Sequence, residues 1–457
     1  MPMPPDAGGD ASYPVPPFDA SKPHHAQPKL RQVRAFSAKQ GEHVFLGLAD
    51  SRQITQRVVL AHPAFQLVLP MLDGVHGLDQ VVKDVGKGLT RELLERVVAQ
   101  LDAAGLLEGP TFDDIYQEFK DDFDKAPSLP PSFTADFADA LVAAKHGGEA
   151  TDEQKRLEGA DALRAQFDAW IDEALREADD PSYDEPPRAI VAPHIDYGRG
   201  WLNYAQAWGR MRVVDQPDRV VVLGTNHYGS ATGVCACDKG YTTPLGECPF
   251  DEAFAKAVAE SLGPDDAARL YANKYDHERE HSIELQTPWL QHVLGTNDKG
   301  AYPSIFAALV HDPSVNAGES YDGKGVGLLP FVDALRSAME TLGGRTLIVC
   351  SADLSHVGPM FGDEEPVVGE QADKPESVRN IAIQHDREML QLFVQAKAEE
   401  MVSTMAWMQN PTRWCSTGAM VATLKALDEP TVRIANYGGA VDQQGSCMVT
   451  SCAAAVF

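Results

Sequence analysis

The pattern of apolar positions divides the first part of the chain into a tail and a small domain. Residues 1–30 contain eight prolines and almost no periodic apolar positions. The segment is therefore not expected to bury enough apolar surface to offset the conformational entropy lost on folding. Within residues 31–125, apolar residues recur at the spacing of one helical face, as in Leu93, Leu94, Val97, Val98 and Leu101, after Thr90 as an N-cap. The pattern predicts a disordered tail over residues 1–30 and a small helical domain over residues 31–125.

The second part of the chain follows a different pattern. Residues 126–186 are polar and rich in alanine between clusters of proline, which predicts a helical linker. From residue 187 to residue 457, β-branched runs alternate with helical stretches. This alternation predicts an α/β domain built from βαβ units around a largely parallel sheet.

Charge and cysteine content narrow the classes of protein that fit. The chain carries 39 Lys and Arg against 67 Asp and Glu, a formal net charge of -28, and no basic cluster stands out, so nucleic acid is not expected as a partner. The seven cysteines are odd in number and confined to the C-terminal half, which argues against a secreted disulfide framework. Without a run of about 18 apolar residues, the expectation is a soluble, cytoplasmic protein with no membrane contact.

Candidate chemistry lies where predicted strands end. Three short apolar runs each lead into a polar cluster with histidine: Ala189–Ala192 before His194, Val220–Leu223 before His227, and Leu347–Cys350 before Asp353 and His356. Side chains just past the carboxyl ends of parallel strands converge on one crevice. Because neutral imidazole suits Fe, Cu and Zn, the recurrence predicts an open metal site.

A fourth histidine lies in the segment from Asp276 to Glu284. If a helix begins near Glu280, His281 and Glu284 lie three residues apart on one face. The segment lacks the HExxH order of zinc proteases. His281 is therefore a candidate for the site or for a structural hydrogen bond, whereas His277 is expected to be solvated.

Cys415 lies just before a predicted helix. The helix dipole favours a thiolate at such a position, and a thiolate serves as a nucleophile or as a metal ligand. A hydrolase with Cys415 as nucleophile and His356 as base would need no metal. The other cysteines fit the role of small buried apolar residues better.

Five ordered motifs resemble those of the MEMO family, the bacterial AmmeMemoRadiSam system protein B: APHIDYG, LGTNHYG, EHSIELQTPWL, SADLSHVG and WCSTGAM. The resemblance covers residues 186 to 457 and implies a three-layer α/β/α sandwich with the LigB-like topology of type III extradiol dioxygenases. It also implies metal ligation by His194, His227 and Cys415, with a pocket lined by Asp353, His356 and His281. Asp196 and Tyr228 depart from the usual family motifs.

The resemblance and the ligand types together suggest a function. A thiolate in place of the carboxylate of extradiol enzymes gives a softer site that accepts Fe(II) or Cu. The first hypothesis is a metal-dependent redox enzyme acting on a small molecule or peptide, in which His281 or His356 transfers protons and Asp353 orients an imidazole. The alternative is a metal- or peptide-binding scaffold without turnover, acting with AMMECR-type and radical SAM proteins.

The small domain at residues 31–125 carries a resemblance of its own. Its sequence QLVLPMLDGVHGLDQVV, followed by a long helix that ends in AGLL, is similar to winged-helix or PqqD-like modules. Such a module would present a peptide or a partner segment to the rest of the chain.

Overall fold

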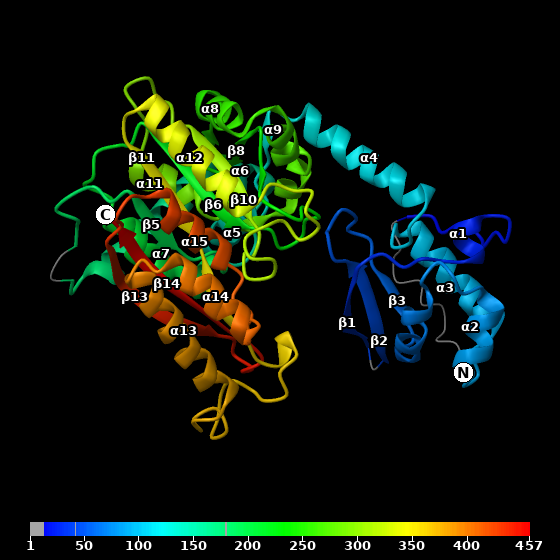
Figure 1. Cartoon of the computed structure of the whole chain (residues 1–457). Helices are drawn as coiled ribbons and strands as arrows, with labels where there is room; N and C mark the ends of the chain where they lie inside the picture. Colours follow the sequence, from blue (N-terminus) through cyan, green and yellow to red (C-terminus); the bar gives the residue numbers. More distant parts are fainter. Residues whose placement is uncertain (1–12, 42, 179–180) are drawn as a thin grey trace. The chain divides into compact units, whose positions relative to one another are not determined.

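The chain divides into two compact units, with the boundary in the sequence between Lys125 and Ala126 (Figure 1, coloured from blue to red along the sequence). The structure is a computed structural model, and it describes residues 13–41, 43–178 and 181–457. Each unit has its own apolar core.

The first unit packs helices against a small antiparallel sheet. Its elements are α1 (Pro23–Ala26), β1 (Val33–Gln40), β2 (His43–Asp50), β3 (Val59–Ala61), α2 (Leu78–Val85), α3 (Arg91–Ala103) and α4 (Pro110–Lys125). The strand order is β1-β2-β3. Thr90 caps α3 as predicted, because its side chain accepts a hydrogen bond from the backbone N–H of Leu93.

The expected disordered tail is ordered over residues 13–30, and residues 1–12 lie outside the described part of the chain. His25 is buried, and its Nε2 lies 2.9 Å from Oδ2 of Asp102 on α3. The backbone of Leu30 donates to Leu72. These contacts hold the segment on the core, which a count of prolines along the sequence does not reveal.

The second unit is built around a mixed sheet. Its strands are β4 (Ser128–Leu129), β5 (Ala189–Ala192), β6 (Arg219–Thr225), β7 (Cys235–Ala236), β8 (Gly240–Thr243), β9 (Gly246–Cys248), β10 (Ile305–Val310), β11 (Thr346–Ser351), β12 (Asp353–Val357), β13 (Val432–Val441) and β14 (Met448–Val456). The main sheet runs β12-β14-β5-β11-β6-β10-β7, with β13 also paired to β14. Its four central strands, β5, β11, β6 and β10, are parallel and buried on both faces, which explains their continuous apolar sequences.

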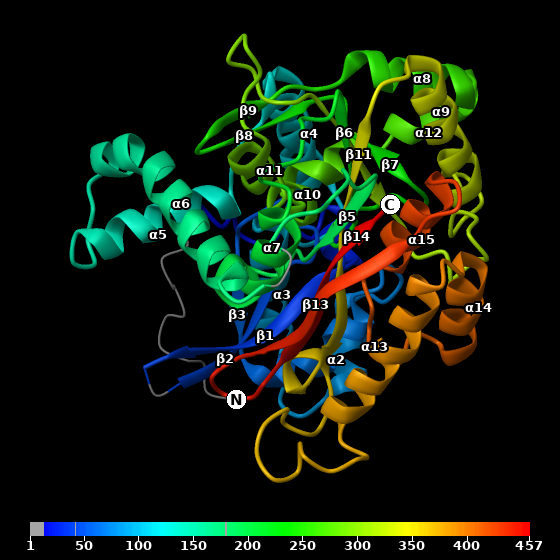
Figure 2. The ribbon, with the colours of Figure 1, turned by 90° about the vertical axis from the view of Figure 1, so that its left-hand side faces the viewer.

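Helices cover both faces of the main sheet (Figure 2). The helices of the second unit are α5 (Phe133–Lys145), α6 (Asp152–Leu175), α7 (Tyr197–Gly209), α8 (Glu252–Leu262), α9 (Pro264–Tyr271), α10 (His281–Glu284), α11 (Thr287–Leu294), α12 (Leu328–Leu342), α13 (Val378–Val394), α14 (Ala398–Met408) and α15 (Thr417–Ala426). Alternate strand residues face one core shared with α8, α12, α13, α14 and α15, while α7 covers β5, β13 and β14. The α/β class is therefore confirmed.

Residues 126–186, expected to be a linker, contribute packed helices to the second unit. Phe167 of α6 is fully buried, and its ring stacks on Trp289 of α11 at a centroid distance of 3.9 Å. The β4 strand pairs with β8. This segment is therefore part of the second unit and not a spacer between two units.

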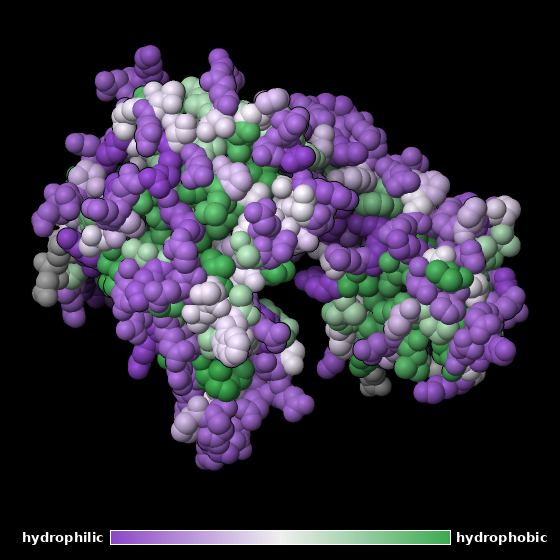
Figure 3. Space-filling view, in the orientation of Figure 1, coloured by the Kyte–Doolittle hydropathy of each residue, from purple (hydrophilic) through white to green (hydrophobic). Residues whose placement is uncertain are grey.

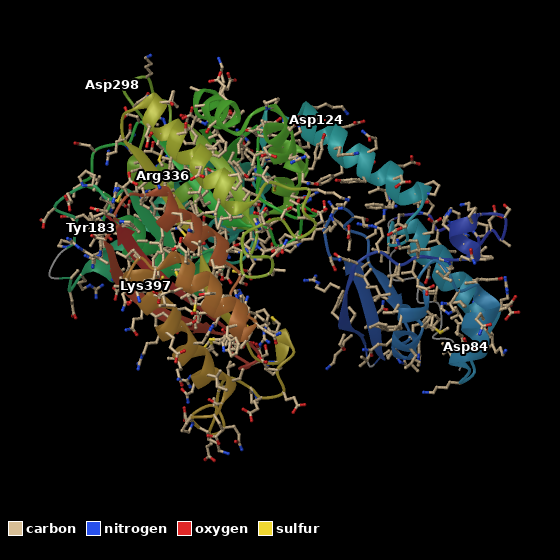
Figure 4. All side chains as sticks on the ribbon, viewed as in Figure 1. Asp84, Asp124, Tyr183, Asp298, Arg336 and Lys397 are labelled. Carbon is tan, nitrogen blue, oxygen red and sulfur yellow. The ribbon has the colours of Figure 1, made fainter. Side chains whose placement is uncertain are left out.

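The visible surface is largely hydrophilic (Figure 3). Hydrophilic residues dominate the face seen in Figure 3, and charged side chains such as Asp84 and Asp298, labelled in Figure 4, are exposed. Within the described ranges, no helix has both the length and the apolar character that crossing a membrane requires.

Candidate metal centre

Three predicted ligands converge at the carboxyl edge of the parallel strands. His194 follows β5, His227 follows β6, and Cys415 precedes α15. One ligand atom from each residue lies within 4.8 Å of the other two, and Nε2 of His194 is 3.2 Å from Sγ of Cys415. Metal–nitrogen bonds of about 2.0 Å and metal–sulfur bonds of about 2.3 Å place two such atoms roughly 3.5 Å apart around a tetrahedral ion. The spacing therefore fits a shared metal ion.

The surroundings of His194 leave its Nε2 atom available as a ligand. The imidazole is buried, and Nδ1 lies 3.3 Å from Oγ of Ser351. That hydroxyl donates its own proton to the Ser282 carbonyl, so it accepts from Nδ1–H of His194. Burial, together with neighbouring imidazoles, lowers the pKa of His194 well below its usual value, which favours the neutral form that binds metals.

A buried carboxylate orients His227. Nδ1 of His227 is 3.0 Å from Oε1 of Glu280, and its backbone N–H donates to Oε2 at 2.7 Å. Glu280 is 2 % exposed and also accepts from the backbone of Ser282. Burial alone would raise the pKa of this carboxyl, but His227 outweighs burial and lowers it to about 2. Carboxylate–histidine pairs of this kind orient metal-bound imidazoles in many proteins.

The imidazole of His227 is only partly exposed, and its partial desolvation disfavours the charged form. Glu280 and the Cys415 thiol outweigh this effect and raise the pKa of His227 well above its usual value. A metal ion bound by His227 would therefore have to displace a firmly held proton. Its affinity would rise with pH.

The sequence hypothesis missed Glu280 and instead paired His281 with Glu284. The available signal for Glu280 was its place directly before His281, where it caps α10 by accepting from Ser282. Glu284 points elsewhere, because its Oε1 accepts from the backbone N–H groups of Ser132 and Thr134 and from the Thr134 hydroxyl. It therefore holds the start of α5 and is not a partner of His281.

The other predicted residues, Asp353, His356 and His281, line the same pocket, which has a volume of about 630 Å³. Burial raises the pKa of Asp353 to about 7, although the backbone N–H of His194 donates to it at 2.9 Å. Nδ1 of His356 faces the carbonyls of Leu354 and Arg413 at 3.0 and 3.1 Å, so it carries the proton and leaves Nε2 as an acceptor. Burial lowers the pKa values of His356 and His281 to about 4.

His277, expected to be solvated, is buried outside the pocket lining. Its Nδ1 lies 2.8 Å from the Tyr241 hydroxyl, and its Nε2 lies 3.2 Å from the carbonyl of Cys235. The expectation was wrong, because the segment forms a 3₁₀ helix, Lys274–Arg279, that turns His277 inward.

One wall of the pocket comes from α5. Phe133 and Phe137 line the cavity, and the ring of Phe133 lies 5.4 Å from that of His281. Phe137 packs edge-on against Tyr197. Sequence reasoning had placed this segment outside the site.

Comparison with known proteins identifies the family of the second unit. The family model named Memo, described as Memo-like protein, matches residues 157–455. The chain therefore belongs to the Memo family. The matched part contains all three candidate metal ligands and the remaining predicted pocket residues, whereas α5 lies before it.

Individual Memo relatives are distant. A MEMO1 family protein of Methanopyrus kandleri is 31% identical over 172 residues, which is 37% of this chain and 53% of the relative. One from Methanococcoides burtonii is 24% identical over 269 residues, 58% of this chain and 84% of the relative. The chain spans about half the length of the relatives from M. kandleri, Aeropyrum pernix and Desulfurococcus amylolyticus.

Proposed function

We propose that this Memo-family protein is a metal-dependent redox protein that binds one Fe(II) or Cu ion through His194, His227 and Cys415. The observation that carries the proposal is the convergence of these three ligand atoms within 4.8 Å, with Glu280 holding the far nitrogen of His227. Two imidazoles and a thiolate suit Fe and Cu better than Mg or Ca, which prefer oxygen ligands. Such an ion would supply one-electron chemistry toward oxygen or a substrate.

The protein's own groups would manage protons around the substrate. Asp353, with a pKa of about 7, is able to hold or release a proton near neutral pH. His356 and His281 are neutral at that pH and line the same cavity, so each offers an acceptor for a substrate proton. The cavity of about 630 Å³ accommodates a small molecule or a short peptide segment.

The hydrolase hypothesis receives less support. It requires His356 to serve as the base for Cys415, but the imidazole nitrogen within 3.2 Å of Sγ is Nε2 of His194. The distance between these two atoms is that expected for two ligands of the same metal ion.

Two finer structural expectations belong to the same proposal. The parallel strands β5, β11 and β6 with the pocket at their carboxyl edge support a LigB-like topology. The three-stranded sheet and helices of the first unit support a winged-helix or PqqD-like module. If the protein is instead a metal- or peptide-binding scaffold without turnover, it would act together with AMMECR-type and radical SAM proteins.

The test is elemental analysis of anaerobically purified protein with oxygen uptake measured on the same samples. We expect about one equivalent of Fe or Cu in the wild type and its loss in His227→Ala and Cys415→Ala. Cys248→Ala, which removes a buried thiol of β9, should retain the metal. Metal-dependent oxygen uptake supports the redox enzyme, metal without uptake favours the scaffold, and a wild type that binds neither metal overturns the proposal.

A further inference from the structure

Asp386 of α13 is fully buried and bonds to residues that directly precede two site residues. Its Oδ1 accepts from the Ser355 hydroxyl and from Nε1–H of Trp414, both at 2.6 Å. Ser355 precedes His356, and Trp414 precedes Cys415. One carboxyl oxygen therefore connects the strand that carries His356 to the loop that carries Cys415.

The second carboxyl oxygen ties this junction to the sheet. Oδ2 of Asp386 accepts from the Tyr437 hydroxyl of β13 at 2.6 Å. The α13 helix contacts both β12 and β13, and it lies beside β13 in Figures 1 and 2. Because three donors converge on one buried side chain, the position of Asp386 is fixed by the fold and not by solvent.

The loop before Cys415 needs such an anchor, because its backbone is strained. Gln409, Asn410 and Arg413 have φ angles of 60°, 48° and 58°, in the left-handed region that side chains other than glycine disfavour. The side chain of Asn410 bonds to both backbone polar groups of Trp414, at 2.7 and 2.8 Å. Strain of this kind persists only where surrounding contacts hold it.

The same loop is bonded to the strand of His356. Nε of Arg413 donates to the carbonyl of His356 at 2.8 Å, and the carbonyl of Arg413 accepts from Nδ1 of His356 at 3.1 Å. The backbone N–H of His356 donates to Thr412. A shift of the Cys415 loop therefore carries the His356 imidazole with it.

We propose that Asp386 is a positioning residue that fixes the Cys415 thiol and the His356 imidazole relative to one another through Trp414 and Ser355. The proposal rests on the proposed function in so far as Cys415 serves as a metal ligand. Asp386 touches no ligand atom in the described contacts, so its effect on the metal is indirect.

Four variants separate positioning from general stability. Trp414→Phe keeps a buried aromatic ring but removes the Nε1–H donor, which breaks the direct bond between Asp386 and the Cys415 loop. Tyr437→Phe is the matched control, because it removes one donor to the same carboxyl from a strand without site residues. Asp386→Ala removes all three bonds, whereas Asp386→Asn keeps an oxygen for Trp414 and turns an amide toward Tyr437.

The first measurement is titration of the full-length, metal-free protein with Co²⁺, followed by the thiolate-to-cobalt charge-transfer absorption. Removing a group that holds a metal ligand in place usually costs 10- to 100-fold in metal affinity. We expect about that loss, with a weakened charge-transfer band, in Trp414→Phe and Asp386→Ala. Asp386→Asn and Tyr437→Phe should stay within about threefold of the wild type. Equal losses in Trp414→Phe and Tyr437→Phe would overturn the proposal.

The second measurement does not depend on metal. Amide hydrogen exchange of the metal-free variants should accelerate over residues 409–416 in Trp414→Phe and not in Tyr437→Phe. If the wild type binds no Co²⁺, the proposed function fails while exchange still tests the positioning role. If Co²⁺ binds but exchange and affinity are unchanged in Trp414→Phe, the proposed function stands and the role of Asp386 is refuted.

Discussion

Replacing Glu280 by Gln should weaken metal binding at His227 without removing any ligand. The carboxyl is 2 % exposed and accepts from Nδ1 and the backbone of His227 and from the backbone of Ser282. Its pKa of about 2, against an ordinary value of 4.5, corresponds to roughly 3 kcal/mol favouring the carboxylate in the folded state. In Glu280→Gln, the side-chain amide would place its N–H group against one of the N–H donors of His227 or Ser282. We therefore expect this variant to lower the free energy of unfolding by about 2–3 kcal/mol. Metal affinity should fall about 10- to 100-fold.

Metal titration and urea unfolding of the same preparations measure the two effects. Glu284→Gln is the matched control, because this buried carboxyl lies four residues away and holds α5 through Ser132 and Thr134. Its metal affinity should stay within twofold of the wild type. The stabilising effect of Glu280 is complete above about pH 4.5 and declines as the pH falls toward 2, because its folded pKa is the lower one. Unchanged metal affinity in Glu280→Gln, beside its loss in His227→Ala, would refute the reasoning.

Three further changes test the fold around the site. Burial lowers the pKa of His277 to about 4, so between pH 4 and about 6.5 the unfolded chain binds more protons than the folded one, and stability rises with pH across that window. The difference in unfolding free energy between the wild type and His277→Gln should therefore vary with pH in that window and be constant above pH 7. A difference that does not depend on pH would contradict the burial of a neutral His277. A Cβ at Gly418 would overlap the backbone carbonyl of His311, so Gly418→Ala should lower the free energy of unfolding in urea by about 1–3 kcal/mol. A variant as stable as the wild type would show that the backbone moves to make room for the methyl group. Phe167→Ala should cost about 3–5 kcal/mol, because the ring is fully buried against Trp289; a loss below about 1 kcal/mol would mean that α6 is not part of the core.

Local sequence patterns predicted the scaffold of the site. The strands β5, β6 and β11 end within two residues of the predicted positions, and each delivers a histidine or Asp353 to the same edge of the sheet. The N-cap of α3 at Thr90 could also be predicted from the residues around it. Strand and helix signals arise from neighbouring residues, and the convergence of parallel strand ends is a rule of the fold class.

The hydrogen-bond partners of buried polar groups could not be predicted from local sequence patterns. The pairing of Glu280 with His227 spans 53 residues of sequence, and the bond between Glu284 and Ser132 spans 152. The same holds for Asp386, whose partners come from three separate elements.

The sequence by itself therefore determined the α/β class, the approximate strand ends and the histidines placed just after them, because these follow from short-range periodicity and motif order. Only the tertiary structure decided which carboxylate orients which imidazole, that α5 closes a wall of the pocket, and that residues 13–30 are ordered. These choices depend on which buried donors and acceptors satisfy one another after packing, and burial makes an unsatisfied group costly whatever its distance along the chain.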